Sequence, residues 1–161
     1  GSGDGRLVHR VDRLRNPARP FFLSAVDRAP SPADLPDSCA WHQADLLDCL
    51  EIIADSDLLV ANLFLHHFEK EQLAQIGRSI ARGPRVVLAC EPVRRRLHLG
   101  QMRALRIIRL HPVTRHDGFV SIGAGFRRAE LPSLLNLDPA RWRITLAETF
   151  FGAYRMLATK L

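Results

Sequence analysis

The fold of this chain is constrained most by short apolar runs that alternate with helical segments. Runs rich in aliphatic residues are typical of buried strands, and apolar residues spaced three and four apart are typical of helices. The predicted strands are 21–26, 40–44, 58–62 and 85–90, and the predicted helices are 6–14, 46–54 and 69–82. This alternation predicts βαβ units and a mostly parallel sheet covered on both faces.

The second half of the chain departs from this alternation. The segment 97–110 is predicted to be a helix with a mixed basic face, and 114–124 a polar loop. The segment 126–135 is predicted to be a short helix that Pro132 shortens or kinks. Two strands at 142–148 and 152–159 then form a hairpin around Phe150 and Phe151.

Composition places the chain among ordinary globular domains. Its 161 residues are 47% apolar and 25% charged, which is about one domain's worth. The apolar stretches 58–61 and 63–65, which Asn62 separates, are far shorter than the roughly 20 residues of a membrane span. The three cysteines have no CxxC spacing, which excludes a disulfide framework or zinc knuckle as the organising feature and indicates a reducing, cytoplasmic location.

The net charge of +6 comes almost entirely from arginine. A basic excess can indicate a polyanion partner. The arginines are scattered, however, apart from the run at 94–96, and they do not alternate with aromatic residues as a nucleic-acid stacking surface requires. A solvated, arginine-rich surface is therefore favoured over nucleic-acid binding.

A glycine-rich loop at the start of the chain leads directly into the first predicted helix. Gly1, Gly3 and Gly5 form a GxGxG pattern around Ser2, and glycines let the backbone turn tightly and approach a ligand. Asp27 lies 22 positions after Gly5, at the end of a predicted strand, where a carboxylate can accept hydrogen bonds from both ribose hydroxyls. The alternatives are a linker for the glycines and a surface turn for Asp27.

Two further strand ends carry polar residues. Asp45 can accept a hydrogen bond from an adenine amino group, and it is equally suited to cap the helix that follows it. Asn62 ends the next strand and is followed by His66 and His67. Because ligands of open α/β sheets bind outside the carboxyl ends of the strands, we expect these side chains to line one crevice.

These motifs resemble the class I S-adenosylmethionine-dependent methyltransferases. The resemblance rests on GSGDG at 1–5, the strand ending at Asp27, QAD at 43–45 and ANLFLHHF at 61–68, and it covers essentially the whole chain. The segment 114–131 is similar to a bacterial subgroup called type 12 methyltransferase domains. The resemblance implies a Rossmann-like three-layer α/β sandwich, with a mostly parallel sheet and an antiparallel C-terminal strand. It also implies one domain over 1–161 with a substrate lid at 94–125.

The resemblance further implies S-adenosyl-L-methionine as the cofactor and a small-molecule acceptor, such as a phenolic, quinone or polyketide-like hydroxyl. Asp27 would bind the ribose hydroxyls, Asp45 the adenine edge, and Asn62 the methionine part of the cofactor. The glycine loop would approach the methionine and ribose portions through Gly1, Ser2, Gly3 and Gly5.

Methyl transfer to a hydroxyl is helped by a base, and histidine suits this role near neutral pH. The candidates are His66, His67, His111 and His116, each of which can instead be a packing, capping or solvated loop residue. Glu91 follows a predicted strand and is either a polar group on the substrate side or the start of a loop. His67 and Glu71 have spacing suited to a metal, but two ligands make no site.

One feature of the family is missing from this sequence. The family's first strand, which precedes the glycine loop, is absent, so the strands ending at Asp27 and Asn62 each lose a neighbour and leave backbone groups unpaired. We therefore expect upstream residues in the full protein and poor stability of these residues alone. An RNA methyltransferase and a non-catalytic scaffold stay open as alternatives, although Asn62 does not begin the Asn-Pro-Pro-aromatic motif of RNA-targeting members.

Overall fold

The computed structural model describes residues 2–16, 18, 20–94 and 124–161. The chain divides into two compact units, Gly1–Ile52 and Ile53–Leu161, and each is described by itself. The predicted helix at 97–110, the loop at 114–124 and nearly all of the lid at 94–125 lie outside the described residues. The assignment of 1–161 to one domain stays a prediction.

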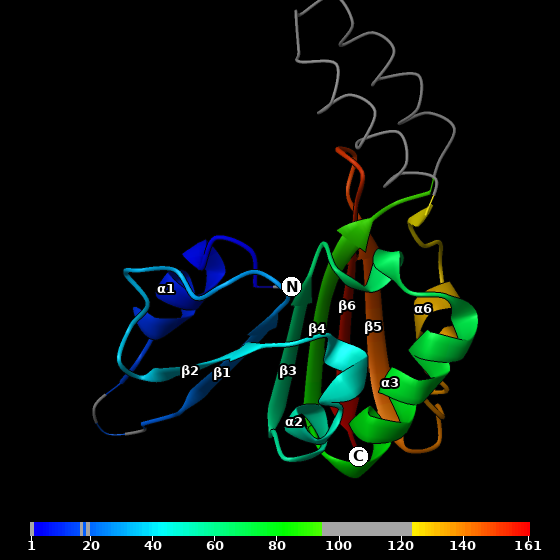
Figure 1. The fold of residues 1–161 in the computed structure, drawn as a ribbon. Helices are drawn as coiled ribbons and strands as arrows, with labels where there is room; N and C mark the ends of the chain where they lie inside the picture. The colour runs from blue at the N-terminus through cyan, green and yellow to red at the C-terminus, as the bar shows by residue number, and fades with distance from the viewer. Residues whose placement is uncertain (1, 17, 19, 95–123) are drawn as a thin grey trace, which may run out of the picture. The chain divides into compact units, whose positions relative to one another are not determined.

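The first unit contains a helix and a two-stranded parallel sheet (Figure 1). Helix α1 spans Arg6–Asp12, and strands β1 (Leu23–Asp27) and β2 (Cys39–Gln43) pair in parallel with Asp27 opposite Gln43. Both strands are confirmed, shifted by one or two residues from the sequence prediction. The small core of this unit consists of Val8, Ala25 and Cys39, packed against Leu23, Leu35 and Trp41.

The predicted helix over 46–54 is wrong as a single element. The structure has a 3₁₀ turn, η1 (Leu46–Asp48), followed by a short helix, α2 (Glu51–Ala54). Cys49 separates the two because its backbone lies outside the helical region, with φ −140° and ψ 42°. A helical pattern of apolar residues cannot reveal such a break, because η1 and α2 still bury Leu46 and Ile53.

The second unit is built on a four-stranded sheet in the order β3-β4-β6-β5 (Figure 1). Its strands are β3 (Leu58–Asn62), β4 (Val86–Pro92), β5 (Trp142–Glu148) and β6 (Ala153–Lys160). Strands β3 and β4 are parallel, whereas β6 lies between β4 and β5 and is antiparallel to both. The mostly parallel arrangement of the early strands and the antiparallel C-terminal strand are thus confirmed.

Helix α3 (Lys70–Arg82) covers one face of this sheet (Figure 1). It begins at a capping box in which Glu69 and Gln72 satisfy each other's backbone amides, and it ends at Gly83. Leu73, Ile76 and Ile80 of α3 are buried, as the apolar spacing predicts. The sheet contributes Val87, Ala89, Tyr154, Met156 and Ala158 to the same core.

Helix α6 (Glu130–Leu134) is shorter than the predicted segment 126–135. Pro132 lies within its first turn, where backbone N–H groups have no partner inside the helix, so the missing donor costs little. No helix in the described part of the chain is long and apolar enough to cross a membrane.

The face of this sheet opposite α3 carries partly exposed apolar side chains. Leu58, Val60, Leu88 and Leu157 are each 40–48% exposed. Val60, Leu88 and Leu157 are direct neighbours across three strands. In the described part of the chain, β1 pairs only with β2, and β3 is an edge strand of its sheet.

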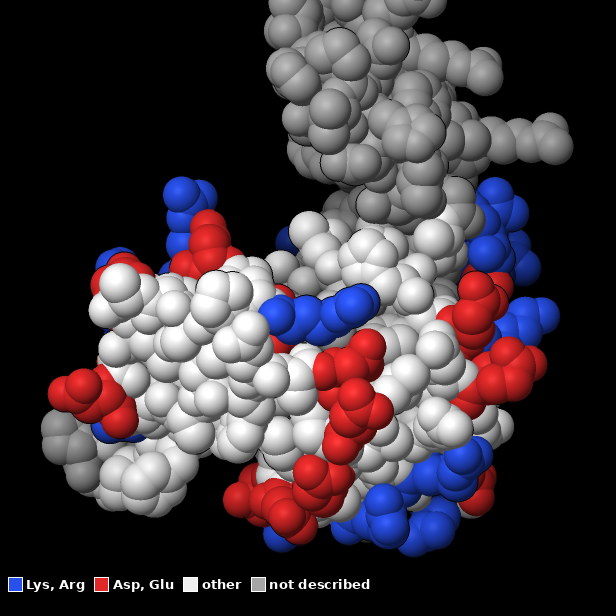
Figure 2. Space-filling view, viewed as in Figure 1, with Lys and Arg blue, Asp and Glu red and all other residues white. Residues whose placement is uncertain are grey.

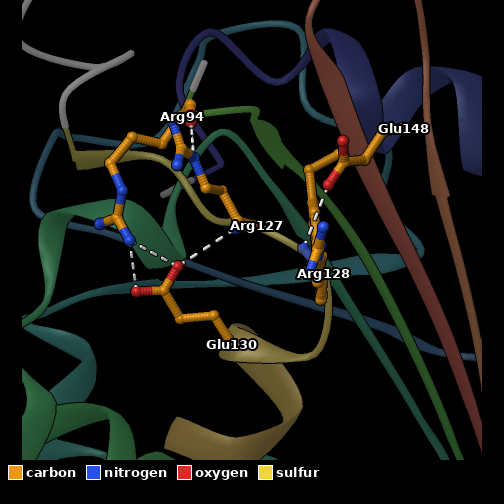
Figure 3. Close-up of polar contacts among 6 residues, drawn as sticks. Arg94, Arg127, Arg128, Glu130 and Glu148 are labelled. Carbon is orange, nitrogen blue, oxygen red and sulfur yellow. Dashed lines mark hydrogen bonds and ion pairs between the residues drawn. The ribbon is translucent and has the colours of Figure 1, made fainter. Parts of the chain in front are cut away.

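The residues that flank 95–123 are joined by backbone and side-chain contacts (Figure 3). The Phe126 amide donates to the Pro92 carbonyl at 2.9 Å, and the Arg94 amide donates to the Phe126 carbonyl at 3.1 Å. The Arg94 guanidinium binds both carboxylate oxygens of Glu130, at 2.5 and 2.7 Å, while Arg127 donates from its backbone to Glu130 and from its side chain to the Arg94 carbonyl. The chain therefore leaves and rejoins the described part at neighbouring backbone positions.

The contact between α3 and α6 depends on a glycine. A Cβ atom at Gly77 would lie 2.0 Å from the Leu135 carbonyl oxygen, so Gly77→Ala forces the two segments apart. Overpacking of this kind costs about 1–3 kcal/mol, against a gain of about 0.5–1 kcal/mol in helix propensity. We expect Gly77→Ala to lower the free energy of unfolding in urea, whereas Gln75→Ala on the exposed side of α3 leaves it nearly unchanged. Equal stability of the two variants would contradict this packing.

Candidate functional site

The glycine-rich loop of the first unit is held to the end of β1. The Ser2 amide and hydroxyl both donate to the Val26 carbonyl, at 3.2 and 3.3 Å. Gly3 and Gly5 have φ values of +57° and +75°, in a backbone region that residues other than glycine rarely adopt. A tight turn thus explains these two glycines, while Gly1 lies outside the described residues.

Asp27 links this loop to the carboxyl end of β1. Its Oδ2 atom accepts a hydrogen bond from the Gly3 amide at 2.8 Å, and its Oδ1 atom accepts one from the Ala29 amide at 2.9 Å. Desolvation by burial is the largest influence on this carboxyl and opposes ionisation, but the hydrogen bonds from Ala29 and Gly3 outweigh it and lower its pKa. Asp27 is therefore an anionic acceptor that is only half-buried.

The carboxylate of Asp27 has capacity for a ligand. An ionised carboxylate offers about four lone-pair sites. The two amides use one site on each oxygen, and the remaining sites suit the paired donors of a vicinal diol. The donor and acceptor chemistry of this group therefore fits the ribose role predicted from the sequence.

Asp45 serves as a cap in the structure. Its Oδ1 atom accepts a hydrogen bond from the Leu47 amide at 3.0 Å and so caps the turn η1. Of the two roles that the sequence left open, the capping role is confirmed. A contact with adenine stays a prediction.

In the second unit, the turn after β3 has an unusual backbone. Asn62 ends β3 with an exposed side chain. Leu63 follows with φ 52°, which is rare for a bulky residue, and its amide donates to the Cys90 carbonyl at 2.8 Å. Such a conformation persists only where surrounding contacts determine it.

Glu91 supplies those contacts. Its fully buried carboxylate accepts hydrogen bonds from the Phe64 amide, at 3.1 Å to either oxygen, and from the Leu65 amide at 3.0 Å. It also lies 2.7 Å from Nδ1 of His66. The expectation that Glu91 begins a loop is wrong, because β4 continues to Pro92. Strand alternation gave the missing signal, since residues 87, 89 and 91 share the buried face.

His66 and His67 differ sharply in exposure. The His66 side chain is only 3% exposed, whereas His67 is exposed. Their ring centroids are 4.1 Å apart with 39° between the ring planes. Partial desolvation of the His67 ring, followed by the neighbouring His66, lowers the pKa of His67, although the charge of Glu91 opposes this. His67 is therefore a neutral imidazole near neutral pH, while His111 and His116 lie outside the described residues.

No group of three or more His, Cys, Asp or Glu side chains in residues 2–16, 18, 20–94 and 124–161 is placed to hold a metal ion.

Solved structures similar to this chain include several methyltransferases. The plantazolicin methyltransferase BpumL, crystallised with a desmethylplantazolicin analogue and S-adenosylhomocysteine, gives a TM-score of 0.73 at 10% identity over 99% of this chain and 74% of its own. The methyltransferase domain of bacterial CtHen1 gives 0.64 at 13% identity over 99% and 86%. Magnesium protoporphyrin IX methyltransferase from Synechocystis, with bound S-adenosylhomocysteine, gives 0.58 at 14% identity over 100% and 72%.

The chain has the fold of the class I methyltransferases. The Rossmann-like architecture predicted from the sequence is thereby confirmed, together with its antiparallel C-terminal strand. No protein-family model matches the chain, and no curated protein matches it in sequence. At identities of 10–14%, the fold is what these structures share with this chain.

The lowered pKa of His67 leads to a measurable prediction. We expect its imidazole to titrate below the ordinary value of 6.5 in a proton NMR titration, with the resonance assigned by comparison with His67→Gln. Because the unfolded chain then binds protons more readily than the folded chain, the wild type loses stability relative to His67→Gln as the pH falls through the folded pKa. A midpoint at or above 6.5 would show that desolvation and His66 do not control this ring.

Proposed function

We propose that this protein is an S-adenosylmethionine-dependent methyltransferase that acts on a small-molecule acceptor. The observation that carries the proposal is the fold, which is shared with methyltransferases that were crystallised with S-adenosylhomocysteine. It is supported by the ionised carboxylate of Asp27 at the carboxyl end of β1, beside the glycine loop. In open α/β sheets this strand end is where ligands bind.

In this proposal the first unit recognises the nucleoside part of the cofactor. Asp27 accepts hydrogen bonds from the ribose hydroxyls through its two remaining acceptor sites. Gly3 and Gly5 keep side-chain bulk away from the ligand, as would Gly1, and Ser2 donates its hydroxyl to the Val26 carbonyl. Asp45 reads the adenine edge with the carboxylate oxygen that does not cap η1.

Asn62, at the end of β3, is assigned to the methionine part of the cofactor, and His67 to the acceptor. When bound, S-adenosylmethionine supplies a methyl group on a sulfonium, so the protein's share of the work is alignment and proton removal. In the reaction, the neutral imidazole of His67 would accept the hydroxyl proton of the acceptor as the acceptor oxygen takes up that methyl group. Of the two adjacent histidines, the exposed His67 suits this role better than the buried His66.

A small-molecule acceptor, such as a phenolic or polyketide-like hydroxyl, is preferred to RNA. The names of two structural neighbours specify plantazolicin and magnesium protoporphyrin IX, both small molecules. Over the described residues on the face drawn in Figure 2, basic and acidic side chains are interspersed, so this face does not resemble the continuous basic surface that RNA binding favours.

Calorimetric titration of S-adenosylhomocysteine tests the cofactor site directly. We expect Asp27→Ala to weaken binding at least about tenfold, because hydrogen bonds to a charged group are worth roughly 1.5–3 kcal/mol. Asp27→Asn, which keeps one acceptor oxygen, is expected to lose less.

The matched control is Asp37→Asn, which removes an exposed carboxylate of the same unit. Asp37→Asn leaves the affinity for S-adenosylhomocysteine unchanged if the weaker binding of Asp27→Ala is specific to Asp27. Unchanged affinity in Asp27→Ala would refute the ribose assignment. No binding by folded wild type would refute the cofactor and favour the scaffold alternative.

A further inference from the structure

A buried carboxylate in the second unit is fully engaged by one turn of the chain. Glu91 is 0% exposed, and Nδ1 of His66 is its side-chain hydrogen-bond partner in the described part of the chain. Burying a carboxylate is costly unless donors replace its water. Here the replacing donors are the Phe64 amide, the Leu65 amide and Nδ1 of His66, all from consecutive residues after β3.

We propose that Glu91 is a positioning residue that fixes His66 with its proton on Nδ1 and thereby holds the ring of His67 in place. The role rests on the proposed function, in which His67 receives the acceptor's proton. Glu91 acts through His66 and does not itself touch a reacting atom.

The arrangement of donors fixes the tautomer. Oε1 faces the amides of Phe64 and Leu65, and Oε2 faces the Phe64 amide and His66. Both oxygens thus act as acceptors, and the proton of the hydrogen bond to His66 lies on Nδ1. In neutral His66 the lone pair is then on Nε2, because a neutral imidazole carries one proton.

The same contacts hold a strained backbone. Leu63 has φ 52° in the turn that separates Asn62 from the residues bound by Glu91. Glu91 accepts a hydrogen bond from the Phe64 amide, directly after this residue, and the Leu63 amide donates to the Cys90 carbonyl of β4. Both anchors come from consecutive residues of one strand, so β4 sets the direction in which the turn presents Asn62 and His67.

The contact between the two rings carries the positioning to His67. The His66 and His67 centroids are 4.1 Å apart, so an orientation imposed on His66 restricts His67. The negative charge of Glu91 also favours a proton on His67, which assists the step in which that ring becomes cationic.

Glu91→Gln separates this role from simple packing. In an isosteric glutamine, the amide oxygen can continue to accept from Phe64 and Leu65, but the amide nitrogen can only donate to Nδ1 of His66. The substitution is therefore satisfied only if the His66 proton moves to Nε2. We expect a switch from Nδ1–H to Nε2–H in long-range nitrogen–proton NMR spectra, recorded at a pH at which His66 is neutral.

The matched control is Asp55→Asn, which neutralises an exposed carboxylate of the same unit and leaves the tautomer at Nδ1–H. A neutral wild-type His66 protonated on Nε2, or an unchanged tautomer in folded Glu91→Gln, would overturn the proposal. The wild-type spectrum decides the tautomer even where the variant does not fold.

His66→Asn is a second variant that tests the link to His67. Its amide nitrogen keeps a donor near the position of Nδ1 but removes the ring that packs on His67. We expect the Phe64 and Leu65 amide resonances to keep their shifts and the His67 ring resonances to move. Unmoved His67 resonances would overturn the positioning role.

The kinetic test uses catechol as a probe acceptor. Glu91→Gln is expected to lower kcat by about tenfold to a hundredfold with KM within about twofold, the pattern of an interaction made in the transition state. An unchanged kcat overturns the positioning role. Titration of S-adenosylhomocysteine into the wild type tests the proposed function separately. If the wild type does not bind this ligand, the proposed function fails, but the NMR spectra still decide the tautomer of His66.

Discussion

The second unit depends on a negative charge that has no contact with solvent. The carboxylate of Glu91 is stabilised by two amides and an imidazole that come from the turn after the neighbouring strand. The dependence is mutual, because the turn leaves its amides unpaired without the carboxylate, and the carboxylate is an uncompensated buried charge without the turn. The strained φ of Leu63 and the placement of His66 and His67 both follow from this mutual dependence of the turn and the carboxylate.

Much of the fold could be predicted from the sequence because strands leave a strong local signal. The strands β3 and β5 have the predicted bounds, and α3 begins and ends where Glu69 and Gly83 indicate. The sequence predictions are wrong where the apolar pattern does not reveal the backbone conformation or the exposure of a side chain. Cys49 breaks a helix whose apolar spacing continues, and the outward-facing Val60 and Leu88 read as core in a continuous apolar run although they are 40% exposed.

The candidate site was predicted less evenly than the fold. Asp27 was found because its separation from the glycine loop follows from a strand, a turn and a helix of ordinary length. The partnership of Glu91 with residues 64–66 could not be found in this way, because it joins positions 25 to 27 residues apart through the register of β3 and β4. Sequence spacing predicts which strand end a residue reaches, but not which donors it meets there.

Comparison of the two carboxylates explains why one suits a ligand and the other suits the fold. Asp27 accepts from two amides, is half-buried, and keeps further acceptor sites beside a glycine loop. Glu91 meets three donors, is fully buried, and has its two oxygens engaged by a single turn. A carboxylate with spare acceptor sites and access can bind a substrate or cofactor, whereas a saturated and inaccessible one can act only through the groups that it orients. Both lie at the carboxyl ends of strands that pair in parallel with a neighbour, so the number of donors and the exposure, rather than the position on the sheet, distinguish their roles.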